Sequence, residues 1–146
     1  MPAEDEHDRL ETLVGQYLRA FNERDEEVLS ELLAEDVVHH GVREDRHGHE
    51  EVHELLEAHV ETFPDYAGET ELVVAGEDAV AVRYTASGTH TGEYRGVEPT
   101  GHAAEWSGIA IYRVEDGEIA EIWIEEDRLG LYEELEMADP PAHLRL

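Results

Sequence analysis

The chain has 146 residues, of which 40% are hydrophobic, and this composition predicts one globular domain rather than a disordered chain. Its 38 acidic residues stand against 10 basic residues, all of them arginine, and the formal net charge of -28 argues against nucleic acid or an anionic membrane as a partner. Because so acidic a surface repels itself unless salt screens it, we predict a cytoplasmic protein in the high-salt cytosol of a halophilic organism.

The first half of the chain has the periodicity of amphipathic helices. A helix is predicted over residues 6–22, and a short second helix follows Asp25. A short strand over residues 37–40 and a polar loop, GVREDRHG, then lead to a third helix over residues 49–62. This helix ends before Pro64, because proline disfavours a helical conformation in the residue that precedes it. No apolar run has the pattern of a signal peptide or the length of a membrane span.

From residue 68 onward, apolar and polar residues alternate with the period of β-strands. The predicted strands cover residues 68–76, 78–90, 102–114 and 118–127. A short helix over residues 128–136 follows, and residues 137–146 form a tail of the single domain 1–146. Helices followed by an antiparallel meander predict an α+β fold with the helices packed on one antiparallel sheet. If that sheet curves, its concave face and the N-terminal helices enclose a pocket.

Residues 49–53 read HEEVH and match the H-E-x-x-H motif of zinc-dependent hydrolases, so a zinc hydrolase is a remote alternative. The helical phase argues against it. His59 lies about 100° around the helix from the two motif histidines, and Leu56 stands where three-histidine enzymes have a glycine. Glu50, the base in such enzymes, faces solvent. We therefore predict no metal site, and we expect His59 to face inward, either as a core histidine or in a pocket wall.

Strict alternation divides residues 119–127 between two faces of the last strand. One face carries Ile119, Glu121, Trp123, Glu125 and Asp127, and the other carries Ala120, Ile122, Ile124 and Glu126. Asp127 therefore ends a strand beside a large aromatic residue. Two interpretations of it remain open, an N-cap of the helix that follows and a catalytic carboxylate.

Four stretches carry a resemblance to a known family: FPD (63–65), GEDAVAVRYTASGTHTGEYRGVEPTG (76–101), YRVEDGEIAE (112–121) and WIEEDRLGL (123–131). With them, the chain from about residue 10 to 136 resembles the SnoaL-like polyketide cyclase family of the NTF2-like superfamily. The resemblance implies a cone-shaped α+β barrel with a deep apolar pocket, and a homodimer. One departure is Ile122, where family members often carry a histidine.

The resemblance also implies a catalytic residue. By motif, Asp127 corresponds to the aspartate that acts as acid and base in an intramolecular aldol closure, without a metal or an organic cofactor. An apolar pocket would raise the pKa of such a carboxyl group and suit it to this exchange of a proton. We therefore predict a cofactor-independent cyclase or isomerase that acts on a small hydrophobic carbonyl compound. The alternative is a non-catalytic module of the same fold that binds a small molecule or associates with another chain.

The remaining candidates for the pocket are aromatic residues and histidines on faces that the pattern turns inward. They are Tyr17, Phe21, His39, His40, His59, His90, Trp106 and Trp123. For each of them, ordinary core packing is the alternative to ligand contact. His39 and His40 occupy alternate faces of one strand, so only one of the two points inward.

Overall fold

The computed structural model describes residues 2–41, 44–94 and 96–136, and only the backbone of residues 2–5. The helices are α1 (Pro2–Glu23), α2 (Glu26–Leu32), α3 (Gly48–Thr62) and α4 (Arg128–Glu134). The strands are β1 (Leu33–His40), β2 (Asp45–His47), β3 (Ala67–Ala75), β4 (Ala79–Thr89), β5 (Ala103–Glu115) and β6 (Glu118–Glu126). The predicted tail, residues 137–146, lies outside the described residues.

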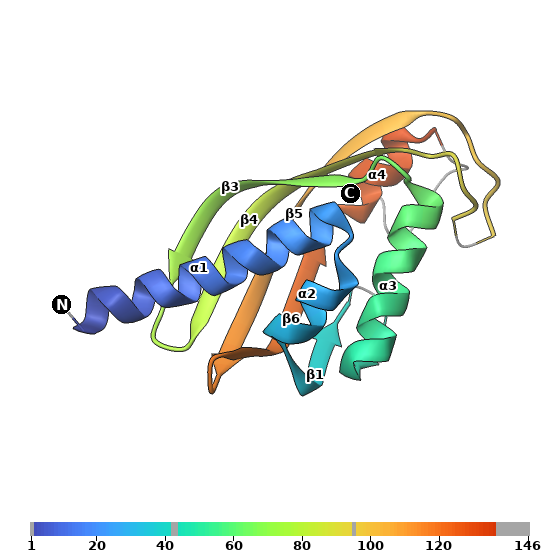
Figure 1. Ribbon diagram of the computed structural model, residues 1–146. Coiled ribbons are helices and arrows are strands. Elements are labelled where there is room, and N and C mark those ends of the chain that lie inside the picture. The colour runs from blue at the N-terminus through green and yellow to red at the C-terminus, as the bar shows by residue number, and fades with distance from the viewer. Residues whose placement is uncertain (1, 42–43, 95, 137–146) are drawn as a thin grey trace.

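The strands form one six-stranded sheet in the order β2-β1-β6-β5-β4-β3. The sheet curves without closing, and α1 lies across its face with α3 beside it (Figure 1). The predicted α+β fold, a curved sheet with N-terminal helices packed on it, is confirmed. One pair departs from the antiparallel pattern, because β1 and β6 run parallel. The chain leaves β1 through β2, α3 and three further strands before it returns beside β1 as β6.

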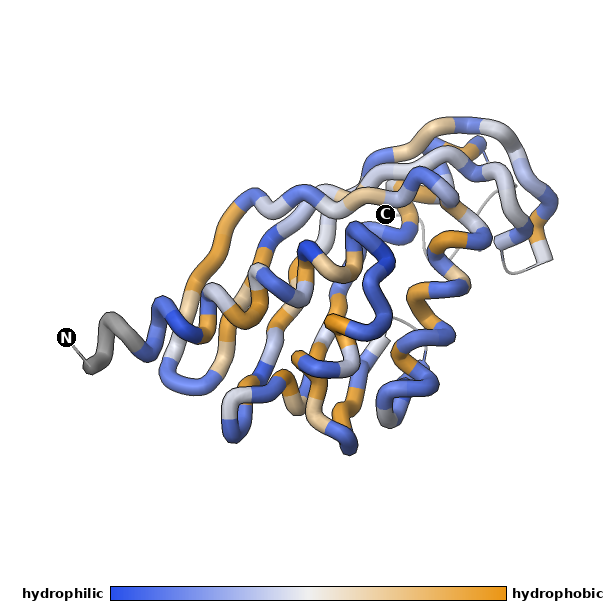
Figure 2. The backbone as a smooth tube through the Cα atoms, viewed as in Figure 1, coloured by the Kyte–Doolittle hydropathy of each residue, from blue (hydrophilic) through white to orange (hydrophobic). Residues whose placement is uncertain are grey.

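Local sequence explains where the helices begin and what they bury. In α1, Val14, Tyr17 and Ala20 recur at the spacing of one helical face and are buried. The Asp25 carboxylate accepts a hydrogen bond from the Val28 N–H at 3.1 Å and so caps the start of α2. The tube in Figure 2 shows hydrophobic positions alternating with hydrophilic ones along the strands, as a sheet with one buried face requires.

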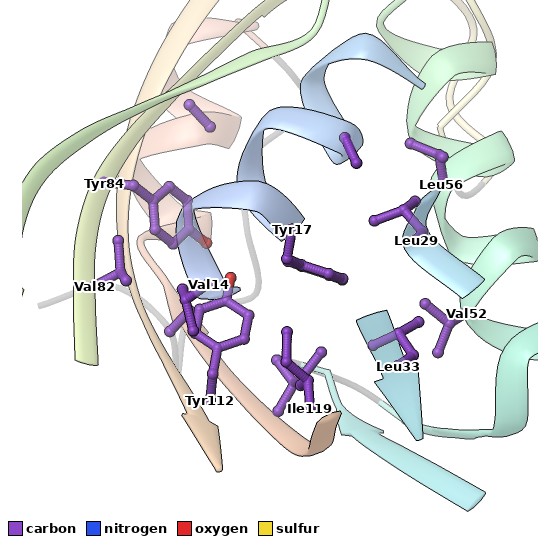
Figure 3. Close-up of a cluster of buried hydrophobic side chains, with 14 of the residues drawn as sticks. Val14, Tyr17, Leu29, Leu33, Val52, Leu56, Val82, Tyr84, Tyr112 and Ile119 are labelled. Carbon is purple, nitrogen blue, oxygen red and sulfur yellow. The ribbon is translucent and has the colours of Figure 1, made fainter. Parts of the chain in front are cut away.

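The core lies between the helices and the concave face of the sheet. On β4 and β5 the buried positions alternate strictly, and the large ones are Val80, Val82, Tyr84, Trp106 and Tyr112. Figure 3 shows Tyr84 and Tyr112 reaching from the sheet toward Tyr17 of α1. Burying a large side chain of this kind contributes about 1.5–3 kcal/mol. The opposite face of the sheet carries exposed hydrophobic residues instead, among them Val74, Ile111 and Trp123.

A β-bulge changes the alternation of β6. Val114 pairs with Ile119 while Arg113 pairs with Glu121, so Ala120 is an extra residue in this strand. Ile119 consequently faces the core together with Ile122, although strict alternation placed it on the face of Trp123. The predicted loop GVREDRHG also differs, because it contains β2, which pairs with the end of β1. Among the described residues, no helix is both long and apolar enough to span a membrane.

Candidate functional site

Two adjoining cavities lie between the helices and the concave face of the sheet. The smaller, of about 110 Å³, is lined by α1, α3 and the inner faces of the strands. The larger, of about 420 Å³, extends toward Phe63, Trp106 and Leu131, and its volume is within the range of about 300–1,000 Å³ typical of ligand pockets. The residues that line both are Glu44, Arg46, Leu55, His59, Glu126 and Arg128.

Glu126 places a carboxylate at the junction of these cavities. Its side chain is 7% exposed. The Tyr84 hydroxyl donates a hydrogen bond to Oε2 at 2.7 Å, and the Trp106 indole Nε1–H donates a second at 3.2 Å. Oε1 lies 3.2 Å from Arg128 Nε. Both donors hold one oxygen of the carboxylate, and a neighbouring cation balances the charge of the other.

Gly108 makes the contact between Tyr84 and Glu126 possible. Tyr84, Gly108 and Glu126 are register partners across β4, β5 and β6. A Cβ atom on Gly108 would lie 2.5 Å from the Tyr84 hydroxyl oxygen. The missing side chain therefore lets the phenol cross β5 and reach the carboxylate, which is one use of a glycine inside a strand.

His59 presents an imidazole to both cavities. Its Nδ1 lies 2.9 Å from the Leu55 carbonyl oxygen, and since a carbonyl only accepts, Nδ1 carries the proton. Burial lowers the pKa of His59, so the ring is neutral near pH 7 and Nε2 has a free lone pair. Phe21 and Tyr66 pack edge to face on the ring, with centroids 5.8 and 5.1 Å away. His59 thus forms part of a pocket wall and offers a hydrogen-bond acceptor there.

The two neighbouring histidines of β1 have opposite environments. His39 faces inward and lines the smaller cavity, and burial lowers its pKa to about 4. Within the described part of the chain, its Nδ1 has no hydrogen-bond partner. His40 faces outward, stacks on Trp123 with centroids 5.4 Å apart, and places Nε2 at 2.6 Å from a Glu121 carboxylate oxygen. This hydrogen bond raises the pKa of His40.

The structure divides the other predicted pocket residues. Tyr17 and Phe21 line the smaller cavity, and Trp106 lines the larger. His90 is fully buried but lines neither cavity, and its Nδ1 accepts a hydrogen bond from the Thr100 backbone N–H at 3.2 Å. The placements of His40 and Trp123 correct the sequence analysis, because both side chains belong to the outer face of the sheet, and neither lines a cavity.

Asp127 lies at the surface, immediately after Glu126. Its carboxylate accepts a hydrogen bond from the Gly130 N–H at 2.8 Å and caps α4. Of the two interpretations of Asp127, the geometry shows the N-cap, and a catalytic role stays a prediction. Of these two adjacent acids, Glu126 is the one that lines the cavities, and sequence reasoning did not select it. Alternation gave a signal for it, because Glu126 shares a face with Ile122 and Ile124.

The HEEVH segment connects α3 to its neighbours. His49 Nε2 lies 2.9 Å from the Leu33 carbonyl oxygen and therefore donates to it, while His53 Nε2 lies 3.0 Å from Ser30 Oγ. Glu50 is exposed. In residues 2–41, 44–94 and 96–136, no group of three or more His, Cys, Asp or Glu side chains is arranged to hold a metal ion. The histidines and the glutamate of the HEEVH segment therefore do not fit the zinc site of a hydrolase.

Known proteins share this sequence pattern and this geometry. The sequence profile of the SnoaL-like polyketide cyclases matches residues 11–135. IdmH of Streptomyces antibioticus, a candidate polyketide cyclase, is similar at 31% identity, with 87% of this chain and 98% of that chain covered and a TM-score of 0.78. AclR of Streptomyces galilaeus, a candidate hydroxylase, is similar at 28% identity over 94% and 92% of the two chains, with a TM-score of 0.80. TsrD of Streptomyces laurentii is 27% identical over 90% and 97%, with a TM-score of 0.81. No curated protein matches the sequence.

Proposed function

Because this chain belongs to the SnoaL-like polyketide cyclase family, we propose that it is a cyclase-type enzyme that moves a proton on a small hydrophobic carbonyl compound. Glu126 is the proposed acid and base. The observation that supports it is a carboxylate, held by Tyr84 and Trp106, in the wall of a cavity that several aromatic side chains also line. A binding module needs no such carboxylate, since burying it costs free energy that an apolar wall would avoid.

The proposed reaction is an aldol-type closure in which atoms balance without a redox partner. Glu126 takes a proton from the carbon next to one carbonyl group, and the electron pair of that C–H bond becomes an enolate. The enolate carbon attacks a second carbonyl carbon of the same molecule, forming a C–C bond. The second carbonyl oxygen then takes the proton back from Glu126 and becomes a hydroxyl group.

The two cavities suit different parts of such a compound. In the larger, Phe63, Trp106 and Leu131 would contact its apolar body. Polar side chains such as Glu61 and Glu93 would face its polar groups. The smaller would hold the reacting carbonyl group, between Glu126 and the His59 imidazole. The neutral Nε2 of His59 is an acceptor for a hydroxyl group of the bound compound, so His59 would orient it.

Replacement of two adjacent carboxylates tests the proposal. The assay follows deuterium incorporation next to the carbonyl group in a panel of hydrophobic ketones and β-diketones, by NMR at molar salt. Glu126→Gln keeps the shape and removes the base, and we expect exchange to fall about a hundredfold to ten-thousandfold. Asp127→Asn is the matched control, because asparagine caps a helix as well as aspartate does.

The outcomes separate the alternatives. If Glu126→Gln exchanges deuterium at the wild-type rate and Asp127→Asn does not exchange it, the acid and base is Asp127. Binding of these compounds, with no exchange above the rate in buffer, would favour the non-catalytic binding module. Melting temperatures of both variants show whether each one folds.

A further inference from the structure

Three tyrosines place unpaired hydroxyl groups in the smaller cavity. Tyr17 comes from α1, Tyr66 from the turn before β3, and Tyr112 from β5, and all three line this cavity. Among the residues that the structure describes, none of these hydroxyls has a hydrogen-bond partner, whereas the Tyr84 hydroxyl is committed to Glu126. We call Tyr17, Tyr66 and Tyr112 the phenol cluster.

The members of the phenol cluster belong to one continuous aromatic wall. The rings of Tyr112 and Tyr17 are 5.4 Å apart, and Phe21 connects Tyr17 to Tyr66 at 6.2 and 5.9 Å. Tyr66 in turn lies 6.1 Å from Trp106, whose indole N–H binds the Glu126 carboxylate. Figure 3 shows the hydroxyls of Tyr84 and Tyr112 directed toward the same part of the interior. The cluster therefore lines the cavity into which Glu126 projects.

Among the described residues, the fully enclosed side-chain polar atoms without a hydrogen-bond partner are His39 Nδ1, His90 Nε2 and Arg128 Nε. The three hydroxyl oxygens are therefore accessible, and the cavity that these tyrosines line is where a bound molecule can reach them. Three phenols that line one small cavity and donate to no protein acceptor are donors available to a bound molecule. Burial raises the pKa of Tyr17, Tyr66 and Tyr112, so all three remain neutral and can donate a proton across the physiological range. An oxygen that gains negative charge is the strongest acceptor for such donors.

We propose that the phenol cluster is an oxyanion-binding site, which takes the oxygen of an enolate or a phenolate. This assignment rests on the proposed function for its part in catalysis, since removal of a proton by Glu126 would create the enolate oxygen. Donors already placed around that oxygen stabilise the charge as it develops, with little reorganisation. The ligand class is thus an enolisable carbonyl compound, and an aromatic phenolate is its stable mimic.

The test uses p-nitrophenol, whose phenolate form absorbs visible light, so its ionisation is read directly while it is bound. Titrations are made with Glu126→Gln, because removing the nearby carboxylate charge allows an anion to bind beside it. In this variant we expect the bound probe to ionise at a lower pH than the free probe. Adding Tyr66→Phe, Tyr112→Phe or Tyr17→Phe should weaken phenolate binding about tenfold each.

Tyr132→Phe is the matched control, since Tyr132 lies on α4 and lines neither cavity. It should bind the phenolate as tightly as its parent. Urea unfolding shows whether each phenylalanine variant folds. Tyr66 is the least buried of the three tyrosines, so Tyr66→Phe should disturb the fold least. The assignment is overturned if the probe binds only in its neutral form, or does not bind, or if the three variants match the control.

The readout separates this inference from the proposed function. If Glu126→Gln retains the deuterium exchange of the wild type while phenolate binding still depends on the tyrosines, the base is wrong and the oxyanion site stands. If exchange falls in Glu126→Gln but the tyrosines leave phenolate binding unchanged, the base stands and the oxyanion site is wrong.

Discussion

Protonation of His39 should destabilise the fold in weak acid. The side chain is 6% exposed, and burial lowers its pKa to about 4. In the unfolded chain the pKa returns to about 6.5. Because the unfolded chain accepts a proton that the folded state resists, the stability present above about pH 6.5 is lost as the pH falls toward about 4.

The magnitude follows from the same two pKa values. At 1.36 kcal/mol for each pKa unit, the full loss of free energy of unfolding is about 3 kcal/mol. About 2.5 kcal/mol of this loss should develop between pH 7.5 and pH 4.5. Such a loss is a large part of the roughly 5–15 kcal/mol that stabilises a domain. Arg46 adds to the resistance to protonation, while Glu126 opposes it.

Urea unfolding of the wild type and of His39→Gln, at molar salt and across this pH range, measures the effect. The many carboxylates titrate alike in both proteins, so the difference between the two curves isolates His39. We expect the wild type to lose about 2.5 kcal/mol relative to the variant on acidification. Parallel curves would refute a buried, neutral His39.

Three further predictions address other parts of the molecule. Gly108→Ala should displace the Tyr84 hydroxyl from Glu126 and lower the free energy of unfolding by about 1.5–3 kcal/mol in urea titrations; an unchanged midpoint would contradict this. The melting temperature should fall when salt is lowered from molar to millimolar, because a net charge of -28 is then unscreened, and a constant value would contradict the halophilic origin. Two copies of the chain should pack against each other through the exposed side chains of Val74, Ile111 and Trp123 on the outer face of the sheet. Ile111→Glu should then convert a dimer into a monomer in sedimentation experiments, and a monomeric wild type would contradict this dimer.

Periodicity predicted the large elements well. The helix expected over residues 49–62 is Gly48–Thr62, and the strand expected over 78–90 is Ala79–Thr89. Both bury one regular face, and burial of a face is what periodicity records. The strand Asp45–His47 was missed, because three polar residues on a sheet edge bury no such face.

The site was predicted less well for a physical reason. Asp127 stands at the position that the family motif marks, but its carboxylate caps a helix at the surface. Glu126 shares a face with Ile122 and Ile124, so its alternation indicated burial. What alternation alone does not show is how a buried carboxylate is stabilised. That depends on Tyr84 reaching across Gly108, a contact between three strands.

The pairing of β6 with β5 beyond the bulge decides which of two adjacent carboxylates faces the cavities. Suppose that β6 paired with β5 without a bulge, starting from the pair of Ile119 with Val114. Strict alternation would then turn Asp127 inward with Ile119 and Glu126 toward solvent. Deletion of Ala120 would join the two halves of the ladder and leave Glu126 in place. Deletion of one residue between Glu121 and Glu126, with the ladder up to Glu121 unchanged, would place Asp127 at the inward position and turn Glu126 to solvent. Loss of a single residue from the second half of β6 is thus a route by which related sequences could transfer a buried acid between neighbouring positions.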